Sequence, residues 1–187
     1  MSYAALPVLR TPRLTLRHLT EQDADAIVDG VGNYVVSKWL GSVPYPYHRE
    51  DAEEFIDRVV AEAAEIWAIC DSSGLQGLVG LQGELGYWLA RRAWGKGYGF
   101  EAARAVVEYW FADAANGALA SGYFDGNAQS GEILRALGFV ATGRTPRFAK
   151  SLNQQVGATD AVLDRTRWNG RQGFNLYTPR LTIRPME

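Results

Sequence analysis

The period of hydrophobic and polar positions changes several times along the chain, which predicts alternating strands and helices. Short apolar runs with branched or aromatic residues indicate strands, and apolar residues three or four apart indicate amphipathic helices. The predicted strands cover residues 11–17, 65–71, 75–81, 84–90, 118–124, 140–148 and 158–168. The predicted helices cover residues 21–29, 34–40, 51–64, the segment from the next loop to about 115, and 127–137. This mixed order predicts an α/β (α+β) fold whose sheet contains both antiparallel and parallel pairs.

Three alternate glycines lie between a predicted strand and a predicted helix. Gly95, Gly97 and Gly99 follow the apolar segment 85–90 and precede the alanine-rich segment 102–111. The first N–H groups of a helix lack intrahelical acceptors, and the helix dipole adds partial positive charge, so main-chain groups can hold a pyrophosphate there. Glycine leaves this approach open. The run predicts a phosphate-binding loop, with a strand-to-helix loop that binds no ligand as the alternative.

Two common phosphate-binding motifs do not fit this run. The Walker A motif places Lys and then Ser or Thr after its last glycine, whereas here Lys96 lies between glycines and Phe100 follows the last one. A dinucleotide fingerprint requires glycine at the position of Phe100 and a repeated βαβ pattern, which the chain does not show.

A second motif occupies residues 127–139. Asn127 can cap a helix, Leu134 and Leu137 share an apolar face, and Gly138 can adopt the left-handed conformation after the last turn. Physical chemistry alone predicts a capped amphipathic helix for this segment.

Together the two motifs resemble those of the GNAT superfamily of N-acetyltransferases. The acyl-CoA-binding motif of that family is similar to Arg92-x-x-Gly95-x-Gly97, preceded by Glu84-Leu85-Gly86-Tyr87-Trp88-Leu89. The ribosomal-protein N-terminal acetyltransferase branch is similar to Asn127-x-x-Ser130 followed by Leu137-Gly138-Phe139, and the match extends from about residue 11 to 168. The resemblance implies a GNAT fold, in which helices flank a central mixed, mostly antiparallel sheet.

The same resemblance implies the activity. A GNAT enzyme moves the acetyl group of acetyl-CoA to a primary amine in a direct ternary complex, and the acceptor is a protein N-terminus or a small-molecule amine. A non-catalytic acyl-CoA-binding regulatory or interaction protein is the alternative. The residues expected to bind acetyl-CoA are Tyr87, Trp88, Leu89, Arg92, Gly95, Lys96, Gly97, Tyr98, Gly99, Asn127 and Ser130.

Catalysis requires a base for the amine and a polar contact for the departing thiolate. Glu84 is the expected base, because related enzymes often use a carboxylate from this strand, and His48 or a water chain is the alternative. Ser130 is the expected donor to the thiolate, with Tyr123 as the second candidate. Each residue also has a purely structural interpretation, such as an exposed turn for Glu84 or packing under the loop for Trp88.

Composition limits the remaining classes of function. The 187 residues, 47% of them hydrophobic, predict one domain over residues 1–170 with an extension over 171–187. A net charge of −2 without a basic run argues against nucleic-acid binding, and no metal site is expected. A single cysteine, Cys70, and the lack of a basic start leading into an apolar run predict a cytoplasmic protein without membrane insertion.

A short sequence occurs twice. Residues 11–17 and 178–184 are identical at six of seven positions, and the seventh exchanges Leu16 for Ile183. The proline near the start and the period-two apolar residues predict an edge strand. We expect the second copy to add a strand to the sheet of this chain or of a partner, and so to allow a homodimer.

Overall fold

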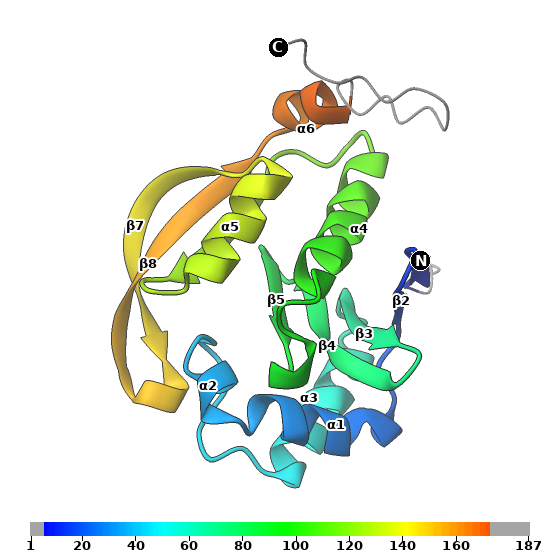
Figure 1. Cartoon of the computed structure of the whole chain (residues 1–187), viewed down its shortest axis with the longest axis vertical. Coiled ribbons are helices and arrows are strands. Elements are labelled where there is room, and N and C mark those ends of the chain that lie inside the picture. The colour runs from blue at the N-terminus through cyan, green and yellow to red at the C-terminus, as the bar shows by residue number, and fades with distance from the viewer. Residues whose placement is uncertain (1–5, 173–187) are drawn as a thin grey trace, which may run out of the picture.

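The computed structural model describes residues 6–172 and contains one eight-stranded sheet in the order β1-β2-β3-β4-β5-β6-β8-β7 (Figure 1). The strands are β1 (Leu9–Arg10), β2 (Thr15–Arg17), β3 (Ile66–Asp71), β4 (Gly74–Leu81), β5 (Leu85–Leu89), β6 (Leu119–Phe124), β7 (Val140–Ala149) and β8 (Gln154–Leu163). All neighbouring pairs are antiparallel except β5 and β6, which are parallel. The predicted mixed, mostly antiparallel sheet is confirmed.

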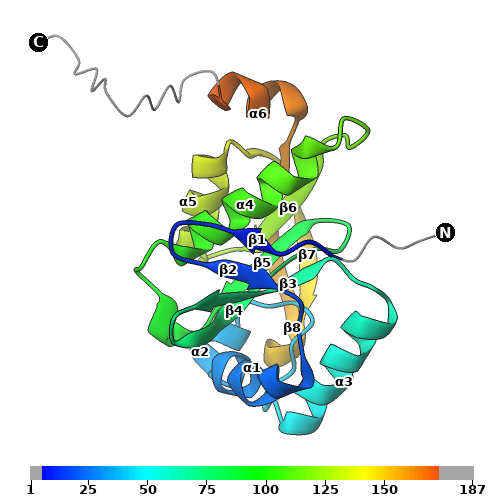
Figure 2. The same ribbon diagram turned by 90° about the vertical axis from the view of Figure 1, so that its right-hand side faces the viewer.

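Helices cover both faces of the sheet (Figure 2). The helices are α1 (Ala24–Val31), α2 (Tyr34–Ser37), α3 (Arg49–Ala61), α4 (Tyr98–Ala112), α5 (Ala128–Leu137) and α6 (Arg165–Gln172), with short 3-10 turns at Glu21–Asp23, Arg91–Ala93 and Lys150–Leu152. Strand β3 is buried on both faces, because Trp67 and Ile69 pack with α4 while Ile66 and Ala68 pack with α1 and α3. The core therefore has two parts, one on each side of the sheet.

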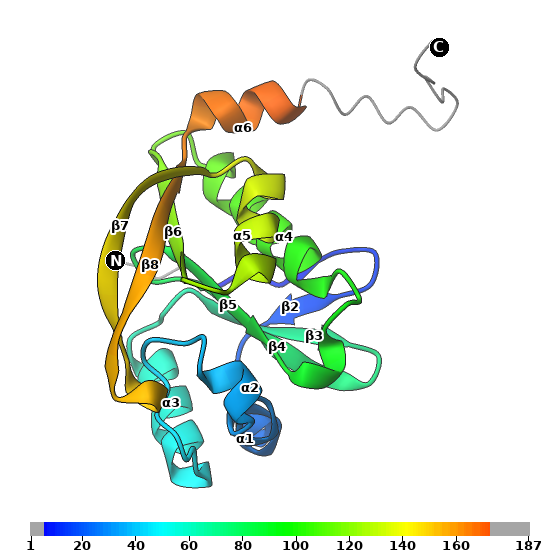
Figure 3. The same ribbon diagram turned by 60° about the vertical axis from the view of Figure 1, so that its left-hand side comes forward.

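Strands β5 and β6 pair only where Leu85 lies opposite Ser121 within the described residues, and the sheet opens beyond that point (Figure 3). On its other side β5 stays paired with β4, and the Ala90 N–H donates to the Gln76 carbonyl at 2.8 Å. Main-chain groups alternate in direction along an antiparallel strand. The N–H and C=O groups of Tyr87 and Leu89 therefore point away from β4 toward the opening.

The predicted strand over 11–17 is wrong in its first half. Residues 11–14 form a turn between β1 and β2, in which the Thr11 N–H donates to the Leu14 carbonyl and the Leu14 N–H donates to Thr11 Oγ1, both at 2.9 Å. Pro12 has no N–H for a ladder bond, which suits a turn. Only Thr15–Arg17 pairs with β3.

The predicted strand over 158–168 is also wrong at both ends. Strand β8 begins earlier, at Gln154, and ends at Leu163, after which α6 begins. Asp164 caps this helix, since its Oδ1 accepts the Arg167 N–H at 2.8 Å, and the Trp168 ring stacks on Phe111 with centroids 5.8 Å apart. The expected domain boundary at residue 170 falls inside α6.

The second copy of the repeated segment, residues 178–184, lies outside the described residues. The extra strand and the homodimer that it would allow remain predictions. None of the helices between residues 6 and 172 combines the length and the apolar character needed to cross a bilayer.

Candidate active site

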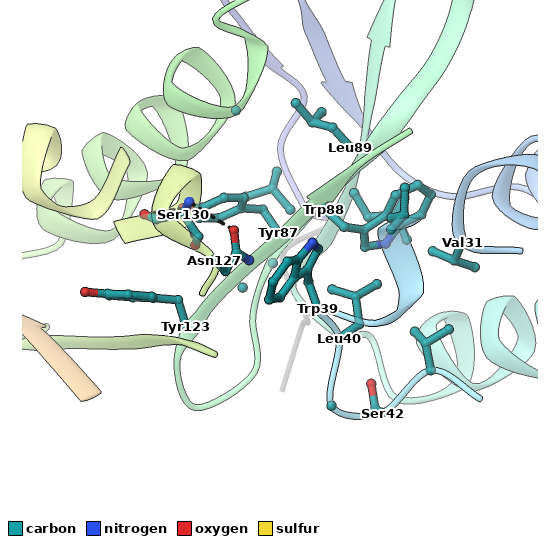
Figure 4. A pocket seen from close by; sticks show the side chains of 18 of the residues that line it. Val31, Trp39, Leu40, Ser42, Tyr87, Trp88, Leu89, Tyr123, Asn127 and Ser130 are labelled. Carbon is teal, nitrogen blue, oxygen red and sulfur yellow. Dashed lines mark hydrogen bonds between the residues drawn. The ribbon is translucent and has the colours of Figure 1, made fainter. Parts of the chain in front are cut away.

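A pocket of about 980 Å³ lies where β5 separates from β6 (Figure 4). It extends from the loop before α4 to the segment between α2 and α3. Most of the predicted site residues line it, namely Glu84, Tyr87, Trp88, Leu89, Gly95, Gly97, Tyr98, Gly99, Tyr123, Asn127 and Ser130. The pocket thus brings together two motifs that lie about thirty residues apart in the sequence.

The glycine loop forms a main-chain cradle at the start of α4. Gly95 and Gly97 have φ angles of +75° and +77°, which glycine adopts without strain. The first backbone bond within the helix runs from the Glu101 N–H to the Gly97 carbonyl at 3.2 Å. The N–H groups of the three residues between them therefore have no acceptor within the helix, so they suit an anion.

Gly99 lies at the contact between α4 and α5. A Cβ added to Gly99 would lie 2.9 Å from Ile133 Cδ1 of α5, closer than real Cβ atoms approach a neighbour. By contrast, a Cβ added to Gly95 would meet nothing within 4 Å, so the backbone angle alone explains that glycine. Gly99 therefore contacts the end of the Ile133 side chain, where the two helices pack beside the pocket.

The turn between β1 and β2 is hydrogen-bonded to the glycine loop and to the first turn of α4. Thr11 Oγ1 donates to Glu101 Oε1 at 2.6 Å, and Arg13 Nε donates to Glu101 Oε2 at 2.7 Å. Arg13 Nη1 also donates to the Lys96 carbonyl at 2.7 Å. These bonds fix both the glycine loop and the first turn of α4, although no local sequence pattern indicates that the turn and the loop are neighbours.

Glu101 should make the free energy of unfolding depend on pH in the acidic range. Burial would raise the pKa of Glu101, but hydrogen bonds from Thr11 and Arg13 lower it below its ordinary value of 4.5. A lowered folded-state pKa adds stability that is complete above about pH 4.5 and is lost as the pH falls through the folded value. We expect Glu101→Gln to destabilise the protein by about 1–2 kcal/mol at pH 7 and by much less at pH 3.

Chemical denaturation of both proteins across this pH range measures the difference. Glu108→Gln is the matched control, because Glu108 forms only an exposed pair with Arg104 on the same helix. An equal loss in the two variants, or a Glu101→Gln loss that is unchanged at pH 3, would contradict this account of the turn.

Arg92, predicted to add charge for phosphate binding, is engaged by residues outside the glycine loop. Its Nη1 pairs with Asp29 of α1, and its Nη2 donates to the Leu75 carbonyl at 2.6 Å. Neither Arg92 nor Lys96 is among the residues that line the pocket. The side chain of Arg92 instead fastens the loop to α1 and β4, whose positions the local motif does not reveal.

Two tryptophans of this region, Trp88 and Trp94, line the pocket and are held by contacts with neighbouring elements. The Trp88 ring occupies the space beside Gly30 of α1, where an added Cβ would lie 2.4 Å from ring atom Cζ3. The Trp94 indole N–H donates to the Leu89 carbonyl at 2.8 Å. That carbonyl is therefore engaged, while the N–H of Leu89 still faces the opening.

Ser130 lies in the first turn of α5, next to the open edge of β5 (Figure 4). Asn127 caps this helix as predicted, since its Oδ1 accepts the Ser130 N–H at 3.3 Å, and Gly138 ends the helix with φ +102°. The Ser130 hydroxyl lies 3.0 Å from the phenol oxygen of Tyr87. The Asn127 cap and the Tyr87 phenol together fix the position of this hydroxyl on the pocket wall.

Glu84 occupies the turn before β5 and belongs to an ion-pair network. Arg147 of β7 donates from Nη1 to Glu84 Oε1 at 2.6 Å and from Nη2 to Asp160 of β8 at 2.7 Å. Hydrogen bonds to Glu84 and Asp160 raise the pKa of Arg147. Arg147, which the sequence motifs did not indicate, holds the Glu84 carboxylate across the opening of the sheet.

Residues 13–140 match the family model described as the acetyltransferase (GNAT) domain, which covers most of the chain. The chain belongs to the GNAT acetyltransferase family. This match confirms the predicted family and the predicted acetyltransferase class. Solved structures of similar shape confirm the predicted GNAT fold.

Known proteins are similar to the chain in sequence or in structure. The chain is 29% identical to the protein named "Uncharacterized N-acetyltransferase YoaA" of Bacillus subtilis (strain 168), over 73% of this chain and 85% of that one. Ribosomal-protein-S5-alanine acetyltransferase from Vibrio fischeri has a similar structure, with a TM-score of 0.73, 17% identity, and coverage of 87% of this chain and 98% of that one. Spermidine N-acetyltransferase from Vibrio cholerae, in complex with CoA and spermine, gives a TM-score of 0.71 at 19% identity, over 85% and 99% of the two chains.

GNAT acetyltransferases use acetyl-CoA, and the pocket has groups that suit it. The N–H groups at the start of α4 suit the pyrophosphate, and the open edge of β5 suits the amides of the pantetheine arm. Among residues 6–172, no group of three or more His, Cys, Asp or Glu side chains could hold a metal ion.

The alternative base, His48, and the alternative donor, Tyr123, lie in different parts of the fold. His48 is exposed at the N-terminus of α3, where its backbone N–H donates to Asp51 Oδ2 at 2.7 Å, and it does not line the pocket. Tyr123 does line the pocket, from β6. A Cβ added to Gly131 of α5 would lie 2.8 Å from Tyr123 Cζ, so this ring packs against the helix.

Proposed function

We propose that this GNAT acetyltransferase moves the acetyl group of acetyl-CoA directly to a primary amine in a ternary complex. The observation that carries the proposal is the single pocket at the opening between β5 and β6. It combines the main-chain cradle, the free edge of β5, a carboxylate at Glu84 and a hydroxyl at Ser130. These are the groups that thioester aminolysis requires.

Binding rests mainly on main-chain groups. The N–H groups of Tyr98, Gly99 and Phe100 receive the pyrophosphate, and the main-chain groups of Tyr87 and the N–H of Leu89 on the β5 edge receive the pantetheine amides. When bound, acetyl-CoA supplies an acetyl group activated as a thioester. The solved spermidine acetyltransferase, which has a similar fold, is in complex with CoA, and this supports the proposal that the present fold binds acetyl-CoA.

Glu84 and Ser130 handle the protons of the reaction. Arg147 engages Glu84 Oε1, and no other hydrogen bond to this carboxylate is formed by the described residues, so Oε2 can accept the amine proton directly or through water. As the new C–N bond forms and the C–S bond breaks, the Ser130 hydroxyl donates to the departing sulfur. Tyr123, on the same pocket, is the alternative donor.

Direct transfer does not require a covalent enzyme intermediate. Cys70 lies on β3 and does not line the pocket. Burial raises the pKa of its thiol, so the reactive thiolate is disfavoured at neutral pH. A reduced, structural Cys70 also agrees with the expected cytoplasmic location.

The acceptor enters from the side of α2 and α3, where Trp39, Tyr47 and Phe55 line the pocket. We propose a protein N-terminus or a small-molecule amine as the acceptor. The two structural neighbours named above carry these two kinds of acceptor in their names.

A panel assay tests the function. Thiol release from acetyl-CoA is measured with peptides that have free N-termini, polyamines, amino acids and aminoglycosides as acceptors, and acetyl-CoA binding is measured separately by calorimetry. We expect binding and acetylation of at least one class of amine. Binding without acetylation of any amine would overturn the enzymatic proposal and favour the non-catalytic CoA-binding protein.

A further inference from the structure

Among the described residues, the Tyr87 phenol is the side chain that hydrogen-bonds to the Ser130 hydroxyl. Its oxygen lies 3.0 Å from Ser130 Oγ and 3.3 Å from the Ser130 backbone carbonyl. Tyr87 comes from β5, at the edge that opens toward the pocket, and Ser130 comes from α5 on the other side of that opening. The motifs indicated only a cofactor-binding role for Tyr87 and left its phenol without a function.

We propose that Tyr87 is a positioning residue whose phenol orients the Ser130 hydroxyl toward the thioester sulfur. The inference rests on the proposed acetyl-transfer function and extends it to a residue that acts through Ser130. The reaction needs no proton to leave Tyr87: its O–H donates to Ser130 Oγ, while the proton of Ser130 is directed to the sulfur.

The two contacts offer the phenol proton two acceptors on Ser130, the backbone carbonyl and Oγ. If the phenol donates to the Ser130 carbonyl, then Ser130 can donate to the phenol oxygen and is turned away from the pocket. If the phenol donates to Ser130 Oγ, the serine proton is free to point into the pocket. The second arrangement uses the shorter contact, and it makes the serine a better donor because one hydrogen bond polarises the next.

The environment of Tyr87 keeps its phenol in the donating form. Burial raises the pKa of Tyr87 to about 12, although the hydrogen bond with Ser130 acts in the opposite direction. The phenol therefore retains its proton throughout the neutral range. It has no role in capping α5, since Asn127 already accepts the Ser130 N–H.

Tyr87→Phe removes this donor and keeps the ring. We expect kcat to fall about 3- to 10-fold, the range for one lost hydrogen bond, with little change in the KM for acetyl-CoA. Tyr109→Phe is the matched control, because Tyr109 also has its pKa raised to about 12 and bonds one side chain, Glu65, but lies outside the pocket lining. In a Ser130→Ala background, Tyr87→Phe should cause no further loss, because it acts through the missing hydroxyl.

A binding measurement tests the same contact without turnover. CoA and desulfo-CoA differ only in the thiol, so the ratio of their Kd values reports the donor that faces the sulfur. Measured at a pH high enough to form the CoA thiolate, the wild-type protein should prefer CoA. We expect Tyr87→Phe to reduce this preference about 3- to 10-fold with the Kd of desulfo-CoA unchanged, and Tyr109→Phe to leave both values unchanged.

The outcomes separate this inference from the proposed function. Equal preference for CoA in the wild type and Tyr87→Phe, or an additive loss of kcat in the double variant, overturns the positioning role even if amines are acetylated. A protein that acetylates no amine but shows the expected change in CoA preference supports the Tyr87 contact and defeats only the proposed reaction. Thermal melts of the variants establish that each is folded.

Discussion

Glu84→Gln should lower kcat/KM for the amine about 100-fold near pH 7, with the affinity for acetyl-CoA unchanged. A positioned general base contributes about 10²- to 10⁴-fold, and the amide cannot accept the amine proton. The replacement keeps an oxygen that can accept from Arg147, so the network that links the β4–β5 turn to β7 is retained. The loss therefore reports the missing base rather than a displaced turn.

The pH dependence of the Glu84→Gln loss identifies its cause. A protein α-amino group has a pKa of about 8 and a lysine-like amine one of about 10.4, so the neutral fraction of the acceptor grows as the pH rises. The deficit should narrow toward the pKa of the amine, because a neutral amine has less need of a base. A deficit that is constant with pH would contradict a proton-accepting role.

Asp160→Asn is the matched control for the ion-pair network. Asp160 accepts from the other nitrogen of the same guanidinium, yet it does not line the pocket. Its replacement disturbs Arg147 and leaves the Glu84 carboxylate in place, so we expect a loss well below that of Glu84→Gln. Equal losses would assign the effect to Arg147 and exclude Glu84 as the base.

The parts of the site that could be predicted from sequence are those fixed by local chain geometry. The left-handed angles at Gly95 and Gly97, the free N–H groups of α4 and the Asn127 cap all depend on residues within a few positions of one another. Such features follow from backbone conformation and helix capping, which the local residue types indicate without knowledge of tertiary contacts. The loop and the helix at 127 were therefore recognisable before the fold was known.

The parts that could not be predicted depend on partners distant in the chain. Arg92 has the right position for a phosphate ligand, but Asp29 and the Leu75 carbonyl engage it, 63 and 17 residues away. Conversely, Arg13 supports the glycine loop through the Lys96 carbonyl, 83 residues away. A basic residue near a motif does not reveal which of these tertiary contacts it makes, so the motif alone did not indicate the contacts of Arg92 with Asp29 and Leu75.

Residues 11–14 illustrate the same limit for secondary structure. Their alternating pattern favours a strand, but the side chain of Thr11 bonds both Leu14 and Glu101 and closes a turn. The local pattern and the tertiary contact compete, and the contact with α4 decides the conformation. At the other end, Trp168 belongs to a helix that Asp164 caps and Phe111 anchors by stacking.

Ser130→Ala should reduce kcat about 100-fold and separate the two candidate donors to the thiolate. The Ser130 backbone N–H would keep its Asn127 cap, and the Tyr87 phenol would keep the backbone carbonyl as an acceptor, so α5 should remain in place. Only the hydroxyl that faces the sulfur is lost. The KM for acetyl-CoA should change little, because the cradle and the β5 edge are untouched.

Tyr123→Phe is the informative comparison, since this phenol is the other candidate donor. Its hydroxyl lies 3.1 Å from where a Cβ on Gly131 would be, so it is held against the backbone of α5, and no described side chain bonds it into the pocket. We expect Tyr123→Phe to retain kcat within about threefold, while Ser130→Thr, which keeps a hydroxyl, should recover much of the activity lost in Ser130→Ala. A large loss in Tyr123→Phe with near-normal Ser130→Ala would reverse the assignment, because the donor to the thiolate would then come from β6 rather than from the first turn of α5.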